Sequence, residues 1–98
     1  MKQISVILIG AGNRGTKYVN YMHEMPERYK VVGVADPNSR NRERARQRYG
    51  LTKDACYESW EEILAQPKLA DLAVITTMDE LHYAPAMKAI ELGYNFAE

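Results

Sequence analysis

The feature that most constrains this chain is a glycine-rich turn directly after its first apolar run. The turn reads Gly10-Ala11-Gly12-Asn13-Arg14-Gly15 and follows the run from Ile4 to Ile9. Gly10 permits a tight turn, Gly12 lets the backbone approach a pyrophosphate, and Gly15 allows close helix–strand packing. The N-terminus of the following helix offers unpaired N–H groups and a partial positive charge to phosphates. The pattern therefore predicts dinucleotide binding.

An acid at the end of the second apolar run supports this prediction. Asp36 closes the run from Val31 to Ala35 and lies 21 positions after Gly15. Carboxylates that bind the adenosine ribose of NAD lie about 20 positions after the glycines. In the alternative interpretation, the carboxylate only stabilises the turn that begins with Asp36-Pro37. A carboxylate repels a 2′-phosphate, which favours NAD as the cofactor, although the nearby Arg40 leaves NADP possible.

Alternating strand and helix patterns predict an α/β fold, a Rossmann-type doubly wound parallel sheet. In the first strand, Ile4, Val6 and Leu8 face one side and Ile7 and Ile9 the other, which indicates that helices cover both faces. Strands are expected at 4–9, 31–36, 55–57, 72–77 and 94–97, and helices at 13–24, 39–49, 59–64 and 82–93, with Asn38 or Ser39 capping the second helix and Gly50 ending it.

The last helix is expected to begin near His82, which places Pro85 in its first turn. Its buried stripe is predicted at i, i+3, i+4 and i+7. The residues of this stripe are Tyr83, Ala86, Met87 and Ile90.

The loop after the fourth strand is expected to line the cofactor, because ligands of open α/β sheets lie beyond the carboxyl ends of the strands. This loop contains Thr76, Thr77, Met78 and Asp79. Asp79 either contacts a ribose or caps the next helix. His82, at the start of the last helix, is expected beside the cofactor, although a histidine there is more often a cap or a packing residue than a catalyst. Arg14, in the glycine turn, either approaches the pyrophosphate or points to solvent.

Composition excludes several classes of partner and site. The 98 residues carry 13 basic and 13 acidic side chains, so no net field favours nucleic acid or membrane. The arginines at alternate positions from Arg40 to Arg48 scatter around a helix, which indicates a solvated surface. Cys56 is the only cysteine and suggests a reducing, cytoplasmic location, and no Cys/His cluster suggests a metal. No apolar run approaches the roughly 20 residues of a membrane span.

An ordered series of motifs resembles the Gfo/Idh/MocA oxidoreductases, the family of glucose-fructose oxidoreductase and inositol dehydrogenase. The motifs lie at 9–15, 33–37, 59–64, 71–77, 82–87 and 93–98, so the resemblance extends over almost the entire chain. Thr77-Met78-Asp79 departs from the family's threonine-proline-asparagine loop, so this chain does not keep the family's residues on the nicotinamide side.

The resemblance implies NAD(P)-dependent oxidation or reduction of sugar-like alcohols or carbonyls. Residues 1–98 would form an incomplete dinucleotide-binding domain that stops in its fifth strand, and a C-terminal α/β domain, absent here, would bind the substrate. The family's catalytic lysine would follow Glu98, so no catalytic residue is expected within this chain. Glu98 itself is expected beside the cofactor, and the full protein is expected to be a homo-oligomer.

Three other functions remain alternatives. One is a noncatalytic module that binds or senses a dinucleotide. Another is a glycosidase that uses bound NAD for transient oxidation, as a subset of the family does. A methyltransferase ranks lower, because its glycine loop usually lacks a third glycine at this spacing.

Overall fold

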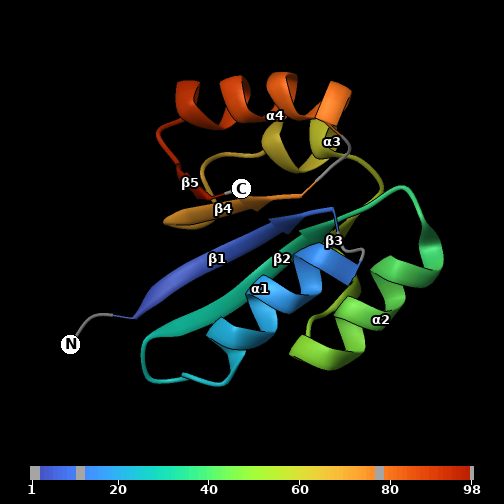
Figure 1. Ribbon diagram of the computed structural model, residues 1–98, viewed down its shortest axis with the longest axis vertical. Helices are drawn as coiled ribbons and strands as arrows, with labels where there is room; N and C mark the ends of the chain where they lie inside the picture. Colours follow the sequence, from blue (N-terminus) through green and yellow to red (C-terminus); the bar gives the residue numbers. More distant parts are fainter. Residues whose placement is uncertain (1–2, 11–12, 77–78, 98) are drawn as a thin grey trace.

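The computed structural model describes residues 3–10, 13–76 and 79–97 (Figure 1). Within them the strands are β1 (Ile4–Ile9), β2 (Tyr29–Ala35), β3 (Cys56–Tyr57), β4 (Leu72–Ile75) and β5 (Asn95–Ala97). The helices are α1 (Asn13–His23), α2 (Ser39–Tyr49), α3 (Trp60–Leu64) and α4 (Asp79–Glu91), with a short 3₁₀ helix at Lys53–Ala55.

All five strands are parallel and lie in the order β3-β2-β1-β4-β5. The chain builds outward from β1 to β2 and β3, and then returns to the other side of β1 for β4 and β5. In Figure 1 the strands run to the right, and α1, α2 and α4 all begin on that side. The reversal between β1 and β4 is the switch point at which open α/β sheets bind ligands. The predicted Rossmann-type parallel sheet is confirmed.

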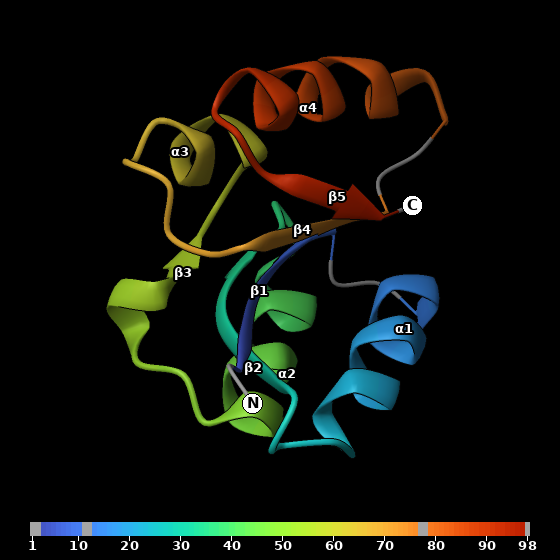
Figure 2. The same cartoon turned by 90° about the vertical axis from the view of Figure 1, so that its left-hand side faces the viewer.

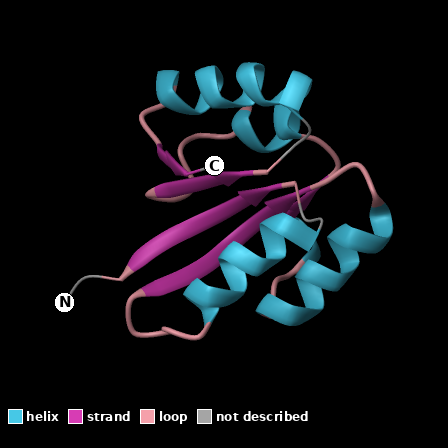
Figure 3. Ribbon diagram, viewed as in Figure 1, coloured by secondary structure: helices cyan, strands magenta, loops and turns pink. Residues whose placement is uncertain are grey.

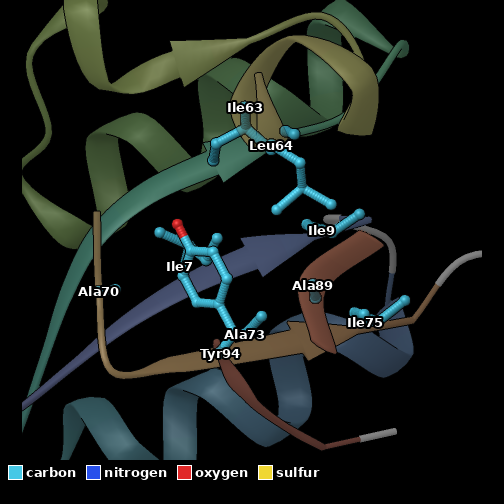
Figure 4. Packing of buried hydrophobic residues seen from close by; sticks show 10 residues of the cluster. Ile7, Ile9, Ile63, Leu64, Ala70, Ala73, Ile75, Ala89 and Tyr94 are labelled. Atoms are coloured by element: carbon cyan, nitrogen blue, oxygen red, sulfur yellow. The ribbon is translucent and has the colours of Figure 1, made fainter. Parts of the chain in front are cut away.

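Helices cover both faces of the sheet, with α1 and α2 on one face and α3 and α4 on the other (Figures 2 and 3). Along β1, Val6 and Leu8 are buried in the cluster between the sheet and the helices α1 and α2. Ile7 and Ile9 are buried in a second cluster, on the face of α3 and α4. The predicted alternation of the first strand is therefore confirmed, except that Ile4 is 39% exposed. Figure 4 shows the second cluster, in which Ile63 and Leu64 of α3 pack over the sheet.

The predicted ends of α2 are both confirmed. The Asn38 side chain accepts a hydrogen bond from the backbone N–H of Asn41, which makes Asn38 the N-cap. Gly50 ends the helix in the left-handed conformation. Other element boundaries differ from the prediction by one or two residues, since β2 begins at Tyr29, β3 at Cys56 and β5 at Asn95.

The prediction for α4 is wrong at its start. The helix begins at Asp79, three residues before His82, so Pro85 lies inside the helix and not in its first turn. A proline at that position removes one backbone hydrogen bond of the helix. Pro85 is almost completely buried, so the helix loses this hydrogen bond but gains the packing of the proline ring.

The predicted stripe of α4 is wrong in part. Met87 and Ile90 are 48% and 50% exposed, whereas the neighbouring Ala89 is fully buried. Ala86 and Leu92 pack partly buried against the cluster that contains Ala89. The helix therefore contacts the core through the small residues Ala86 and Ala89, and the larger Met87 and Ile90 are about half exposed.

Candidate functional site

The candidate site is the rim where β1, β2 and β4 end. Three backbone hydrogen bonds continue the sheet beyond the regular strands. The N–H of Gly10 donates to the carbonyl of Ala35 at 2.8 Å, that of Thr76 to Ile9 at 2.9 Å, and that of Asp36 to Tyr57 at 3.1 Å. These bonds hold the first residues of three loops in register with each other.

Gly10 makes the tight turn out of β1 with φ +91°, a conformation that side chains disfavour. A Cβ at this position would also lie 3.1 Å from atoms of Thr76. The close approach of β4 to this turn thus adds a second reason for glycine. The helix α1 begins at Asn13, only three residues further on.

Asp36 lies at the end of β2, beside this turn. Its side chain is buried, with the residue only 7% exposed, and its Oδ1 accepts a hydrogen bond of 2.7 Å from the backbone N–H of Asn38. This is the turn contact that the alternative interpretation of the sequence expected. The contact fixes the carboxylate at the rim.

Arg42 is a part of this region that the sequence reasoning missed. Its guanidinium donates a hydrogen bond of 2.7 Å to the backbone carbonyl of Asp36. The predicted Arg40 is exposed in the first turn of α2, and with Ser39 and Arg42 it lines an open hollow of about 640 Å³. The signal that could have indicated this contact is the position of Arg42, six residues after Asp36 and near the start of α2. The sequence alone does not distinguish Arg42 from the other arginines that alternate along this helix.

Thr76 was predicted to line the cofactor, and its hydroxyl contacts the glycine turn. The Oγ1 donates to the carbonyl of Gly10 at 2.6 Å. A second, longer approach of 3.5 Å joins the same oxygen to the carbonyl of Ile9. Thr76 thus connects the end of β4 to the start of the predicted phosphate loop.

Other predicted site residues remain predictions. Asn13, Arg14 and Gly15 lie in the first turn of α1, and Asp79 and His82 are the first and fourth residues of α4. Ala11, Gly12, Thr77, Met78 and Glu98 lie outside the described residues.

Cys56 and Glu43, which both lie outside the rim, have shifted pKa values. Burial raises the pKa of the Cys56 thiol, which disfavours the reactive thiolate. A hydrogen bond from Arg46 lowers the pKa of Glu43 to about 2, and a hydrogen bond from Gln47 makes a smaller contribution to this shift. Within residues 3–10, 13–76 and 79–97, no three His, Cys, Asp or Glu side chains gather as a metal site would require. None of the helices described there could cross a bilayer.

Comparison with known proteins gives a match to a family model described as an oxidoreductase family with an NAD-binding Rossmann fold, over residues 4–96. Among solved structures, an NAD-binding protein from Listeria innocua is 32% identical, with a TM-score of 0.77 over 97% of this chain and 26% of its own.

Two further solved structures share the fold at lower identity. The WlbA dehydrogenase from Chromobacterium violaceum, in complex with NADH and UDP-GlcNAcA, is 23% identical, with a TM-score of 0.86 over 98% of this chain and 27% of its own. Biliverdin reductase from Synechocystis, in complex with biliverdin and NADP⁺, is 22% identical, with a TM-score of 0.79 over 95% and 28%. The chain thus spans about a quarter of the length of these structures.

Proposed function

The chain belongs to the Gfo/Idh/MocA family of NAD-binding oxidoreductases, and we propose that it is the cofactor-binding part of an enzyme that oxidises or reduces a sugar-like substrate. The predictions of the family and of NAD as its cofactor are confirmed by the family match. The substrate, the reaction of the whole protein and the residue roles are the proposal.

The observation that carries the proposal is the buried Asp36 at the end of β2, beside the turn from β1 into α1. The turn and the helix N-terminus suit a pyrophosphate, because both present backbone N–H groups. The carboxylate suits the two hydroxyls of the adenosine ribose, since it accepts hydrogen bonds from both. These groups lie on adjacent strand ends, as a dinucleotide stretched across the rim requires.

In this proposal the chain binds and orients the cofactor. Bound NAD supplies the hydride chemistry, and the protein supplies position and electrostatics. Asp36 holds the ribose, while the amides of the Gly10–Gly15 turn hold the phosphates. The family resemblance assigns the proton transfer to a lysine after Glu98, so we propose cofactor binding, and not the catalytic step, for the residues of this chain.

A sugar-like substrate is supported by the family resemblance and by one structural relative. The WlbA dehydrogenase was crystallised with UDP-GlcNAcA, and its chain is almost four times as long as the part matched here. We place the substrate pocket of this protein in a second domain, in a homo-oligomer located in the cytoplasm. The single cysteine supports the location, because a reducing compartment keeps thiols free.

We propose NAD in preference to NADP. The Asp36 carboxylate would repel a 2′-phosphate, whereas the exposed Arg40 could screen it. WlbA was crystallised with NADH and biliverdin reductase with NADP⁺, so structures with this fold hold either cofactor.

Calorimetry with NADH, NADPH and S-adenosylmethionine tests the proposal. We expect the chain to bind NADH more tightly than NADPH and not to bind S-adenosylmethionine. In Asp36→Asn the amide oxygen can keep the hydrogen bond from Asn38, but the charge is lost. This variant should raise the Kd for NADH about tenfold and reduce the preference of the protein for NADH over NADPH. Asp54→Asn, an exposed site in the 3₁₀ helix, is the matched control.

Two results would contradict the proposal. If Asp36→Asn bound NADH as tightly as wild type, the carboxylate would not hold the ribose. If a protein extended through its second domain bound NADH but reduced no sugar-like carbonyl, the noncatalytic module or the redox-assisted glycosidase would replace the oxidoreductase.

A further inference from the structure

We propose that Thr76 is a positioning residue for the phosphate loop and acts through the backbone carbonyl of Gly10. The inference rests on the proposed function, because it concerns the same dinucleotide site. It differs from the sequence prediction for Thr76, which placed this residue directly against the cofactor.

The contacts of the hydroxyl carry the inference. The Oγ1 of Thr76 donates its only proton to the carbonyl of Gly10 at 2.6 Å. The Thr76 backbone is fixed independently, since its N–H donates to Ile9 at 2.9 Å. A donor held by the sheet thus holds a carbonyl at the first residue of the loop.

Gly10 is consequently anchored from both neighbouring strands. Its N–H donates to Ala35 at the end of β2, and its carbonyl accepts from Thr76 at the end of β4. Since β2 and β4 flank β1, the two bonds pull on Gly10 from opposite sides. Because the peptide bond is planar, fixing the carbonyl also fixes the direction in which the chain leaves Gly10.

This anchoring matters where backbone groups themselves bind the ligand. The amides of a phosphate loop stabilise the pyrophosphate only if they already point toward it. A glycine with φ +91° has more backbone freedom than other residues, so a turn made by glycine needs external contacts to stay in one conformation. The Thr76 hydroxyl supplies such a contact.

The experiment compares Thr76→Val, which keeps the shape but removes the hydroxyl, with Thr76→Ser, which keeps the hydroxyl. Thr52→Val is the matched control, because Thr52 is exposed and its side chain makes no capping hydrogen bond. NMR titrations measure the Kd of each protein for NADH and for adenosine, which lacks the phosphates but keeps the ribose.

We expect Thr76→Val to raise the Kd for NADH about fivefold, as the loss of one hydrogen bond predicts, and to change the Kd for adenosine less than about twofold. Thr76→Ser and Thr52→Val should bind NADH within about twofold of wild type. A merely structural role would weaken both ligands together. Equal losses for both ligands, an unchanged Kd for NADH, or no rescue by serine would overturn the proposal.

Amide hydrogen exchange in the unliganded protein separates this proposal from the function itself. Thr76→Val should speed exchange at the Gly10 amide about tenfold, because the bond from Gly10 to Ala35 then opens more often. Unchanged exchange would overturn the role of Thr76. A wild-type chain that failed to bind NADH would contradict the proposed function, and the exchange rates would still decide whether Thr76 holds the loop.

Discussion

The two faces of the sheet bury their helices in different ways. On the face of α1 and α2, the helices contribute the buried Val19, Ala45 and Tyr49. On the other face, α3 contributes Ile63 and Leu64, but α4 packs through Ala89 and Pro85 while Met87 and Ile90 stay about half exposed. Apolar periodicity therefore locates the buried side of a helix only where large side chains make the contact. Where a helix rests on alanine and proline, the larger side chains mislead.

The largest expected effect comes from shortening buried side chains of β1, because this strand contributes to the core on both faces of the sheet. Leu8→Ala should cost about 3 kcal/mol in the free energy of unfolding, because Leu8 is fully buried and its removal leaves a cavity. Ile7→Ala should cost a similar amount on the opposite face. Urea unfolding measures both.

Ile4→Ala is the control on the same strand, since Ile4 is 39% exposed and should cost about 1 kcal/mol or less. The expected difference between buried and exposed positions of β1 would be contradicted if Ile4→Ala lowered the free energy of unfolding as much as Leu8→Ala. It would also be contradicted if only one of the two buried variants were destabilised.

A smaller effect distinguishes the two sides of α4. Ala89→Leu should cost about 2 kcal/mol, because the fully buried alanine leaves no room for three further carbons against the sheet. Ala84→Leu makes the same change at an exposed position of the same helix and should change stability by less than about 0.5 kcal/mol. Thermal unfolding of the two variants gives the comparison directly. If Ala89→Leu were tolerated as well as Ala84→Leu, α4 would not rest on its small residues.

The part of the fold that the sequence predicted is the part that depends on local rules. The alternation of Val6 to Ile9, the Asn38 cap and the Gly50 end each follow from a few neighbouring residues, and the structure shows all three. The early start of α4 was missed because the usual rule places a proline in the first turn of a helix. Pro85 instead lies inside the helix and packs into the core.

The candidate site also has a part that local sequence rules predict and a part that they do not predict. The glycine turn and Asp36 are visible in the sequence because their proposed roles follow from residue types at a known spacing. The bonds from Arg42 to the Asp36 carbonyl and from Thr76 to the Gly10 carbonyl depend on tertiary placement. The second joins residues 66 positions apart, and no local pattern of side chains reports which backbone carbonyl a hydroxyl will reach.

The smallest effect concerns the outer surfaces of the helices, where the faces differ again. On α2, Arg46 donates through Nε to Glu43 at 2.9 Å, whereas on α4 the exposed Lys88 and Glu91 are 4.0 Å apart. The hydrogen bond from Arg46 lowers the pKa of Glu43 from its ordinary value of 4.5 to about 2. A lowered pKa stabilises the folded state above the unfolded pKa, and this stabilisation is lost as the pH falls through the folded value.

Glu43→Gln should therefore unfold at a lower temperature than wild type at pH 7, by at most about 4 °C because solvent screens an exposed pair. The difference should shrink between pH 4.5 and about 2, where Glu43 of the folded protein becomes protonated. Glu91→Gln on α4 is the matched control and should match wild type at every pH, since a 4.0 Å pair between exposed side chains contributes little. Thermal melts followed by circular dichroism across this range test the difference. A Glu43→Gln deficit that stayed constant from pH 7 to pH 2 would show that its cause is packing on α2 and not the charge of Glu43.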